Sequence, residues 1–347
     1  MSLLRSLSVA YLAICAALPA SAQVRFGDQL EAIRFAGSEN MMVHALSARG
    51  LPVQARLARE KILAQMAMRG DTGDVSRREF SVSPVLAYDP NINGGYANDG
   101  FTVAGIPFTI GKEHEAVGGL LLGVGAAGRA RVVLGTDTGL ALTASGTFGY
   151  APDHDMSKIR LGASACVNHM IDYSTFGHVC LETSWRDYAL GETSRNEARV
   201  GVSRVFGSDL GLHEAGAELT IRRTDSGDPY TQAIAGLTLT SALPGPLAIR
   251  TRLEVGEEVE GVLAMRERAV LGLGFPVFGR QSSVSVAVQS DRGGRWLGED
   301  LTRKVTSFGI GHRVSNKLRI SASFAGIDAS ADFFDDTRFG LNLAVRF

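Results

Sequence analysis

Alternating apolar and polar positions run through most of the chain. In residues 140–150, Leu140, Leu142, Phe148 and Tyr150 share one face, and small or polar residues occupy the other. A period of two predicts a strand. Two less regular stretches, 78–88 and 117–135, come before residues 140–150. Comparable stretches then recur to the chain end, with apolar positions at Ile159/Leu161, Val179/Leu181, Val200/Val202, Leu219/Ile221, Leu237/Leu239, Leu247/Ile249, Leu271/Leu273, Val284/Val286, Phe308/Ile310, Leu318/Ile320 and Phe339/Leu341. Most are about ten residues long, enough for a tilted strand to cross a bilayer.

The connections between these stretches indicate the topology. Gly326–Arg338 and Asp291–Arg303 are expected to be long loops, whereas Val314–Lys317 and Gly279–Ser282 are expected to be short turns. A barrel of this kind has an even number of strands, short turns on the periplasmic side and long loops outside. Phe101–Ile110 would be a fifteenth strand, and Pro107 makes it the weakest. We therefore expect about 14 strands, both termini in the periplasm, and one long loop over Asp89–Val117.

The first residues have a different pattern. Residues 1–22 contain a basic start, an apolar run and Ala20-Ser21-Ala22, which together are typical of a signal peptide. Residues 23–77 are rich in Ala, Arg, Met and Glu, which predicts a short helical segment, either a periplasmic lead-in or a plug. Its spacing also vaguely echoes one tetratricopeptide unit, although a single repeat cannot stabilise itself by stacking. The barrel is expected to occupy residues 78–347.

Periodicity alone does not separate a soluble sandwich from a membrane barrel, because both have one apolar face. The signal peptide, the aromatic final residue and the unbroken series of strands favour the barrel, since closure removes exposed strand edges. The fold class predicted is therefore all-β, a closed antiparallel transmembrane β-barrel in the bacterial outer membrane. The 41 glycines and mean hydropathy of +0.08 agree with strands whose apolar residues come every second position. A net charge of −1 gives no reason to expect a nucleic-acid partner.

Charged side chains occupy the face predicted to line the lumen. Such charges need a partner or water. Two interpretations stay open, namely cross-linking of the barrel wall and a selectivity surface for a passing solute or polypeptide. The residues are Arg160, Glu182, Arg186, Arg199, Glu218, Arg222, Arg250, Arg252 and Glu254.

Cys166 and Cys180 are the cysteines that follow the signal segment, and both fall on the lumen face of neighbouring strands. They lie at equal distances from Tyr173 in the intervening turn, so a cross-strand disulfide is possible in an oxidising compartment. Without a histidine partner they predict no zinc site. Histidines are scattered and no serine has a histidine and an acid at a recognisable spacing, so we expect no enzyme, no cofactor and no metal.

Two resemblances refine these expectations. Phe339, Leu341, Leu343, Val345 and Phe347 resemble the C-terminal assembly signal of bacterial outer-membrane barrels, which implies the barrel-assembly machinery as a partner during insertion into outer-membrane lipid. Asp89, Asn91, Ile92 and Asn93 resemble the start of the barrel in the surface lipoprotein assembly modifier (Slam) family. That resemblance implies a fourteen-stranded barrel that helps a lipoprotein client to the cell surface without nucleotide or metal. The chain would be a reduced relative, because most of the family's tetratricopeptide domain is missing.

Two functions follow as hypotheses. The first is translocation or surface display of a protein client through a barrel with a mobile lateral seam. The alternative is a passive porin or channel for small solutes.

Overall fold

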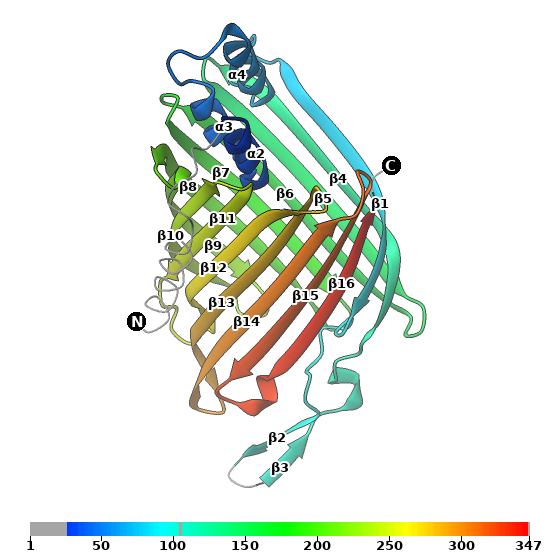
Figure 1. The fold of residues 1–347 in the computed structure, drawn as a ribbon. Coiled ribbons are helices and arrows are strands. Elements are labelled where there is room, and N and C mark those ends of the chain that lie inside the picture. Colours follow the sequence, from blue (N-terminus) through cyan, green and yellow to red (C-terminus); the bar gives the residue numbers. More distant parts are fainter. Residues whose placement is uncertain (1–25, 104–105, 346–347) are drawn as a thin grey trace.

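The structure is a computed structural model that describes residues 26–103 and 106–345. The proposed signal peptide (1–22) and Phe347 lie outside the described residues. Fourteen antiparallel strands of the described chain form one closed barrel, each strand paired with its neighbours in sequence and the last paired with the first (Figure 1). The predicted fold class is confirmed.

The described chain begins with helices α2 (Phe26–Ala36), α3 (Glu39–Ala45) and α4 (Val53–Gln65). The barrel strands are β1 (Val75–Asp89), β4 (Gly119–Gly135), β5 (Thr138–Ala151), β6 (Met156–Met170), β7 (Thr175–Tyr188), β8 (Gly191–Ser208), β9 (Gly211–Asp225), β10 (Tyr230–Leu243), β11 (Leu247–Gly256), β12 (Ala264–Val277), β13 (Arg280–Trp296), β14 (Glu299–Arg313), β15 (Leu318–Ala329) and β16 (Asp336–Val345). A separate hairpin, β2 (Gly100–Val103) with β3 (Ile106–Thr109), and the short 3₁₀ turns η1 (Lys112–His114) and η2 (Asp332–Phe334) complete the described elements.

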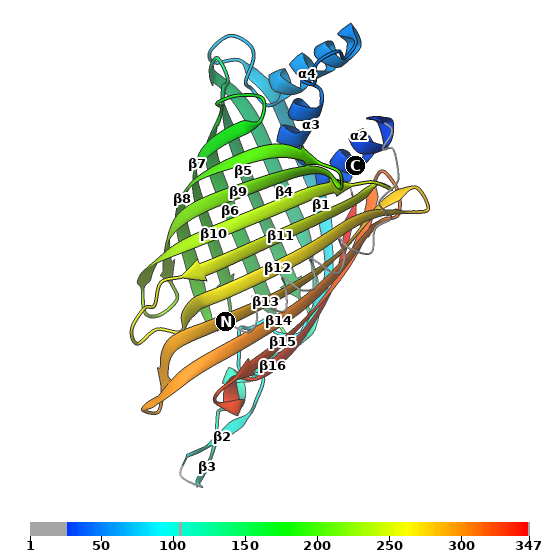
Figure 2. The same cartoon turned by 60° about the vertical axis from the view of Figure 1, so that its left-hand side comes forward.

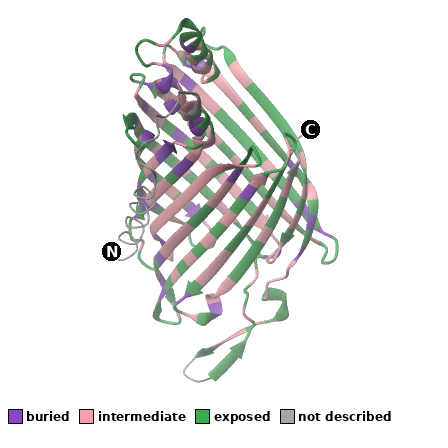
Figure 3. Ribbon diagram, viewed as in Figure 1, coloured by how far each residue is buried: buried purple, intermediate pink, exposed green. Residues whose placement is uncertain are grey.

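The strands run obliquely around the barrel (Figure 2), and exposed residues recur along them (Figure 3). The exposed side chains of the outward face are largely apolar. Leu219 is 63% exposed, Leu181 62% and Leu237 59%, and Phe339 and Leu341 of the last strand are about half exposed. A water-soluble protein rarely leaves so extended an apolar surface uncovered, whereas lipid solvates such a surface. The apolar face of these strands therefore points to lipid and not to a packed protein interior. No helix among the described residues is both long and apolar enough to cross a membrane.

The barrel has two different ends. At one, which we call the turn end, β1 begins and tight turns connect the strands, for example Thr136-Asp137 and Phe278-Gly279. At the other, the loop end, the 29-residue connection from β1 to β4 contains the β2–β3 hairpin. Phe101–Ile110 is thus not a barrel strand, and the even count agrees with the parity argument.

Two of the predicted long loops are wrong in extent. β13 and β14 continue to a two-residue turn at Leu297-Gly298, where both residues have positive φ, and β15 and β16 leave only Ser330–Asp335 between them. Positive φ at both central residues is typical of tight hairpins. Charged residues and glycines follow one another at residues 291–295, so the apolar–polar alternation that marks a strand in the sequence is interrupted before this turn.

The largest apolar core lies at the turn end. Ile33 of α2 and Met41 and Val43 of α3 are fully buried against lumen-facing side chains of the wall: Met170, Phe176, Val205, Leu212 and Ala242. α2 and α3 thus lie at the lumen opening beside β8–β12, whereas α4 contacts β1 (Figure 1). This docking places polar residues of the N-terminal segment inside the barrel.

Candidate functional site: the barrel lumen

The lumen is lined by the face opposite the apolar band. The charged residues predicted to face the lumen alternate along their strands with outward side chains such as Leu161, Leu181 or Leu219. The register between neighbouring strands determines which charged side chains lie close together. The resulting contacts differ between the middle of the lumen and the loop end.

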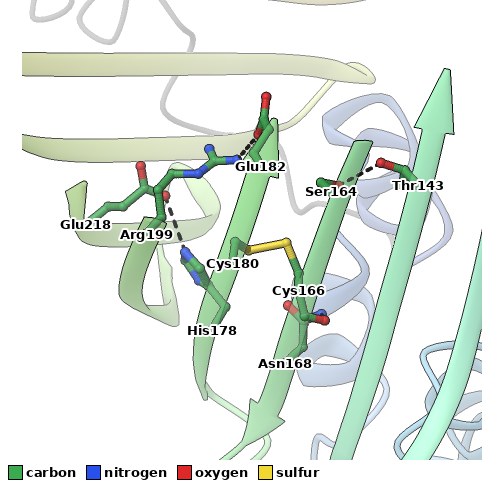
Figure 4. Close-up of a disulfide and its surroundings, with 9 residues drawn as sticks. All are labelled: Thr143, Ser164, Cys166, Asn168, His178, Cys180, Glu182, Arg199 and Glu218. Carbon is green, nitrogen blue, oxygen red and sulfur yellow. Dashed lines mark hydrogen bonds and ion pairs between the residues drawn. A yellow bond between two sulfur atoms is a disulfide. The ribbon is translucent and has the colours of Figure 1, made fainter. Parts of the chain in front are cut away.

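In the middle of the lumen, Cys166 of β6 and Cys180 of β7 are register partners and form a disulfide (Figure 4). Beside it, Arg199 is ion-paired with Glu182, and His178 Nε2 lies 3.3 Å from Glu218 Oε2. Thr143 and Ser164 share a hydrogen bond of 2.7 Å one strand further. The disulfide therefore joins two strands within a continuous polar wall.

The other charges in the middle of the lumen are also paired. Arg222 Nε donates to Glu197 Oε1 at 2.7 Å, and Arg252 Nη2 donates to Glu218 at 2.7 Å and to Glu254 at 2.9 Å. Glu254 also pairs with Arg268 at 3.4 Å. Arg250 differs, since it forms no ion pair with a described residue and instead lines a 240 Å³ cavity under the helices. The paired residues fit the interpretation of charges that cross-link the wall, whereas Arg250 and Arg195 of β8 do not.

The loop end of the lumen contains a larger cavity of 650 Å³, which we call the luminal chamber. Its charged lining residues are Asp89, Lys158, Arg160, Arg186 and Arg338, four basic residues against one acid. Lys158 Nζ donates to Asp89 Oδ2 at 2.7 Å and to the Asn91 carbonyl at 2.8 Å. Residues from both faces of β16 line the chamber, including Leu341, so it reaches the β1–β16 junction.

The Asp-x-Asn-Ile-Asn segment builds the cover of this chamber. Asp89 Oδ1 accepts from the Asn91 amide at 3.0 Å, and Asn91 Nδ2 donates to the Gly95 carbonyl at 2.7 Å. Ile92 and Asn93 are buried, and Asn93 Nδ2 donates to the Glu115 carbonyl while its Oδ1 accepts from the Val117 amide. The segment thus ties both ends of the long loop to each other and, through Lys158, to the wall.

At the turn end, the start of α3 bridges two parts of the wall. Glu39 forms a two-bond ion pair with Arg131 of β4, at 2.7 and 3.0 Å. Ser38 Oγ and Asn40 Nδ2 donate to the two carboxylate oxygens of Glu214 on β9, at 2.5 and 2.7 Å. β4 and β9 are five strands apart in the barrel, so these contacts hold the helices across the opening.

A further contact fixes the helices to the turn between β6 and β7. Arg59 of α4 stacks over the Tyr173 ring at 4.6 Å, and His44 Nδ1 lies 3.2 Å from the Tyr173 carbonyl. In the same turn, hydrogen bonds from the Ser174 hydroxyl and amide hold the pKa of Asp172 below its usual value. The turn is therefore held in one conformation by its own side chains, which gives the helices a fixed support.

Sequence reasoning missed Lys158, Arg131, Glu39 and Glu214. Lys158 shares the lumen face with Arg160, two residues away, and alternation was a usable signal for it. Glu39 is 92 positions from its partner Arg131, and Glu214 is 174 positions from its partner Asn40, so neither contact has a local signal in the sequence. No group of three or more metal-ligating side chains occurs in the part of the chain that the structure describes.

Comparisons with known proteins add little to this geometry. No protein-family model and no curated protein matches the chain. Among solved structures, OccK1 (OpdK) of Pseudomonas aeruginosa is similar with a TM-score of 0.43 and 8% identity, covering 79% of this chain and all of that one. OmpT of Vibrio cholerae lacking loop L8 has a TM-score of 0.41 and 12% identity over 80% of this chain and all of that one.

Proposed function

We propose that the protein is a channel of the bacterial outer membrane for small polar solutes. The observation that carries this proposal is an exposed apolar outer wall around a lumen lined by charged and polar side chains, with a 650 Å³ chamber at one end. Porin-type barrels have this arrangement. The tight turns and both chain termini would then lie in the periplasm, and the long β1–β4 loop outside the cell. The proposal assigns no catalytic activity.

The N-terminal helices would narrow this channel at its periplasmic mouth. They are held there by buried apolar contacts and by the Glu39–Arg131 and Glu214 contacts, which join distant parts of the wall. Conduction would depend on the space left beside them. This gives residues 26–65 a role as a partial plug.

Planar-bilayer recordings test both parts. The full-length protein is expected to conduct steadily, and Glu39→Arg is expected to raise the conductance by placing a cation against Arg131 and Arg77, which loosens the plug. Glu31→Arg on α2 is the matched control, because Glu31 is exposed and forms no ion pair with a described residue. Absence of steady conductance in all three proteins would refute the channel.

A second function, export of a protein client such as a lipoprotein, is favoured by one observation. β1 and β16 are register partners at Ala87↔Asn342 and Tyr88↔Leu341 only, among the described residues, whereas β1 pairs with β4 from Val75 to Asp89. A short junction costs little to open, and unpaired edges invite strand pairing with a client. The Asp-x-Asn-Ile-Asn segment, which resembles that of the Slam family, supports the same proposal.

Protease shaving of surface-exposed lipoproteins separates the two functions. A strain carrying Ala87→Cys/Asn342→Cys, cross-linked across the junction, is expected to lose the exposed set if clients leave sideways, while solute uptake continues. Ala87→Cys/Leu121→Cys, which links β1 to β4, is the control. Unchanged exposure in both strains, and in the deletion strain, would exclude export.

A further inference from the structure

Two arginines face each other directly in the luminal chamber. Arg160 of β6 and Arg186 of β7 are register partners, and both side chains line the chamber. Like charges directly opposite on neighbouring strands destabilise a sheet. The acid nearest to Arg160 is Asp89, at 3.5 Å, and the same carboxylate oxygen already accepts from Lys158 at 2.7 Å. Arg186 forms no ion pair or hydrogen bond with any described residue.

The row that contains these arginines extends across four strands. Thr147 of β5 is the register partner of Arg160, and Thr193 of β8 is the register partner of Arg186. All four residues line the chamber. Across β5, β6, β7 and β8 this row therefore consists of a hydroxyl, two guanidinium groups and a second hydroxyl, and it contains no acid.

The middle of the same lumen shows that this wall places acids beside its arginines elsewhere. Arg199, Arg222 and Arg252 all have carboxylate partners. Arg338, which also lines the chamber, is ion-paired with Asp336, whereas among the described residues the Arg160–Arg186 pair has only the carboxylate of Asp89, which Lys158 already engages. The missing negative charge would be supplied by an anion that enters the chamber.

We propose that the Arg160–Arg186 row is a binding site for the oxyanion group of a small solute, a carboxylate or a phosphate. Guanidinium groups bind both anions with two parallel hydrogen bonds, and threonine hydroxyls can donate to the remaining oxygens. A chamber of 650 Å³ is of the size that encloses small molecules. The inference names the solute class of the channel and, in that respect, rests on the proposed function.

Calorimetric titration of the full-length protein in detergent tests the site without requiring conduction. Inorganic phosphate, succinate and a neutral sugar of similar size are the probes. At least one anion is expected to bind and the sugar is not, and Arg160→Gln or Arg186→Gln should weaken binding about tenfold or more, because each removes hydrogen bonds to a charged group. Binding of phosphate alone or of succinate alone identifies the oxyanion.

Two further variants sharpen the result. Arg250→Gln removes the same charge from the lumen outside the chamber and should change the affinity less than about twofold. Arg186→Lys keeps the charge but loses the planar fork, so it should also weaken binding if the contact is bidentate. Equal losses in Arg250→Gln and Arg186→Gln would indicate a diffuse field and overturn the site.

Conductance recorded on the same preparations separates the two proposals. A folded protein that conducts but binds neither anion would refute the oxyanion site and leave the channel standing. Anion binding without any conductance would retain the site and refute the channel. Heat-dependent mobility in gel electrophoresis shows that each variant is folded.

Discussion

Strand β1 meets β4 on one side and β16 on the other, and the two junctions differ greatly in length. Toward β4 the pairing runs from Val75 to Asp89 with one irregularity near its start. Toward β16 the described residues pair only at Ala87 and Tyr88. In the same register Val345 faces Pro84, which has no N–H to donate. The edge of β1 that faces β4 is thus hydrogen-bonded along its length, whereas the edge that faces β16 is paired only near the end of the strand.

The part of β1 beside the short junction carries residues that protect an exposed strand edge. Arg77 and Arg78 lie on the part of β1 that pairs with β4 but not with the described residues of β16. Charged side chains and proline discourage pairing between exposed edges of different molecules. Most of the pairing in the wall is between strands that are adjacent in sequence, and closure of the barrel by β1 and β16 adds only a short ladder to it.

The largest effect is expected from locking the short junction. Ala87→Cys/Asn342→Cys closes a loop that contains nearly the whole barrel, so oxidation should raise the free energy of unfolding by up to about 5 kcal/mol. The control Ala87→Cys/Leu121→Cys joins strands that are already paired and closes only one connection, so it should gain less. Urea titrations followed by the fluorescence of Trp185 and Trp296 measure both. A larger gain in the control would contradict the comparison.

Hydrogen exchange is expected to show the next largest difference. Amides of β1 that point away from β4 should exchange on the order of a hundredfold faster than those that point toward β4, because few of them are paired with β16. The amides of β5, paired on both sides throughout, are the internal reference. Exchange at equal rates on both sides of β1, measured by NMR in detergent micelles, would show that the junction is closed along its length.

The smallest effect concerns single side-chain pairs. Tyr88 faces Leu341 across the short junction and Leu120 across the long one, all on the outward face. A double-mutant cycle for Tyr88 and Leu120 should give a coupling of about 0.2–1 kcal/mol, the range for cross-strand pairs. The cycle for Tyr88 and Leu341 should give less, since fraying of the junction weakens the pair. Equal coupling in the two cycles would remove the energetic distinction between the junctions.

Several elements were predictable because their signal is local. Alternation predicted all fourteen barrel strands, and Pro107 correctly marked Phe101–Ile110 as not belonging to the wall. The lumen face of Arg160, Glu182 and Arg252 followed from the same period of two. The hairpin at Leu297-Gly298 was missed because charged residues and glycines interrupt the alternation at residues 291–295. Lys158 was predictable from its position two residues before Arg160 on the same strand, but its contact with Asp89 was not, because the two residues are far apart in sequence.

The sequence by itself determined that this chain forms strands and which face of each strand is apolar, because both properties depend on neighbours one or two positions away. Only the tertiary structure decided which residues of different strands face each other. The Arg160–Arg186 row, the Cys166–Cys180 disulfide, the Glu39–Arg131 contact and the short β1–β16 junction all depend on register and closure. A shift of one residue would exchange the lumen and lipid faces of a strand, so register is fixed by the fold as a whole.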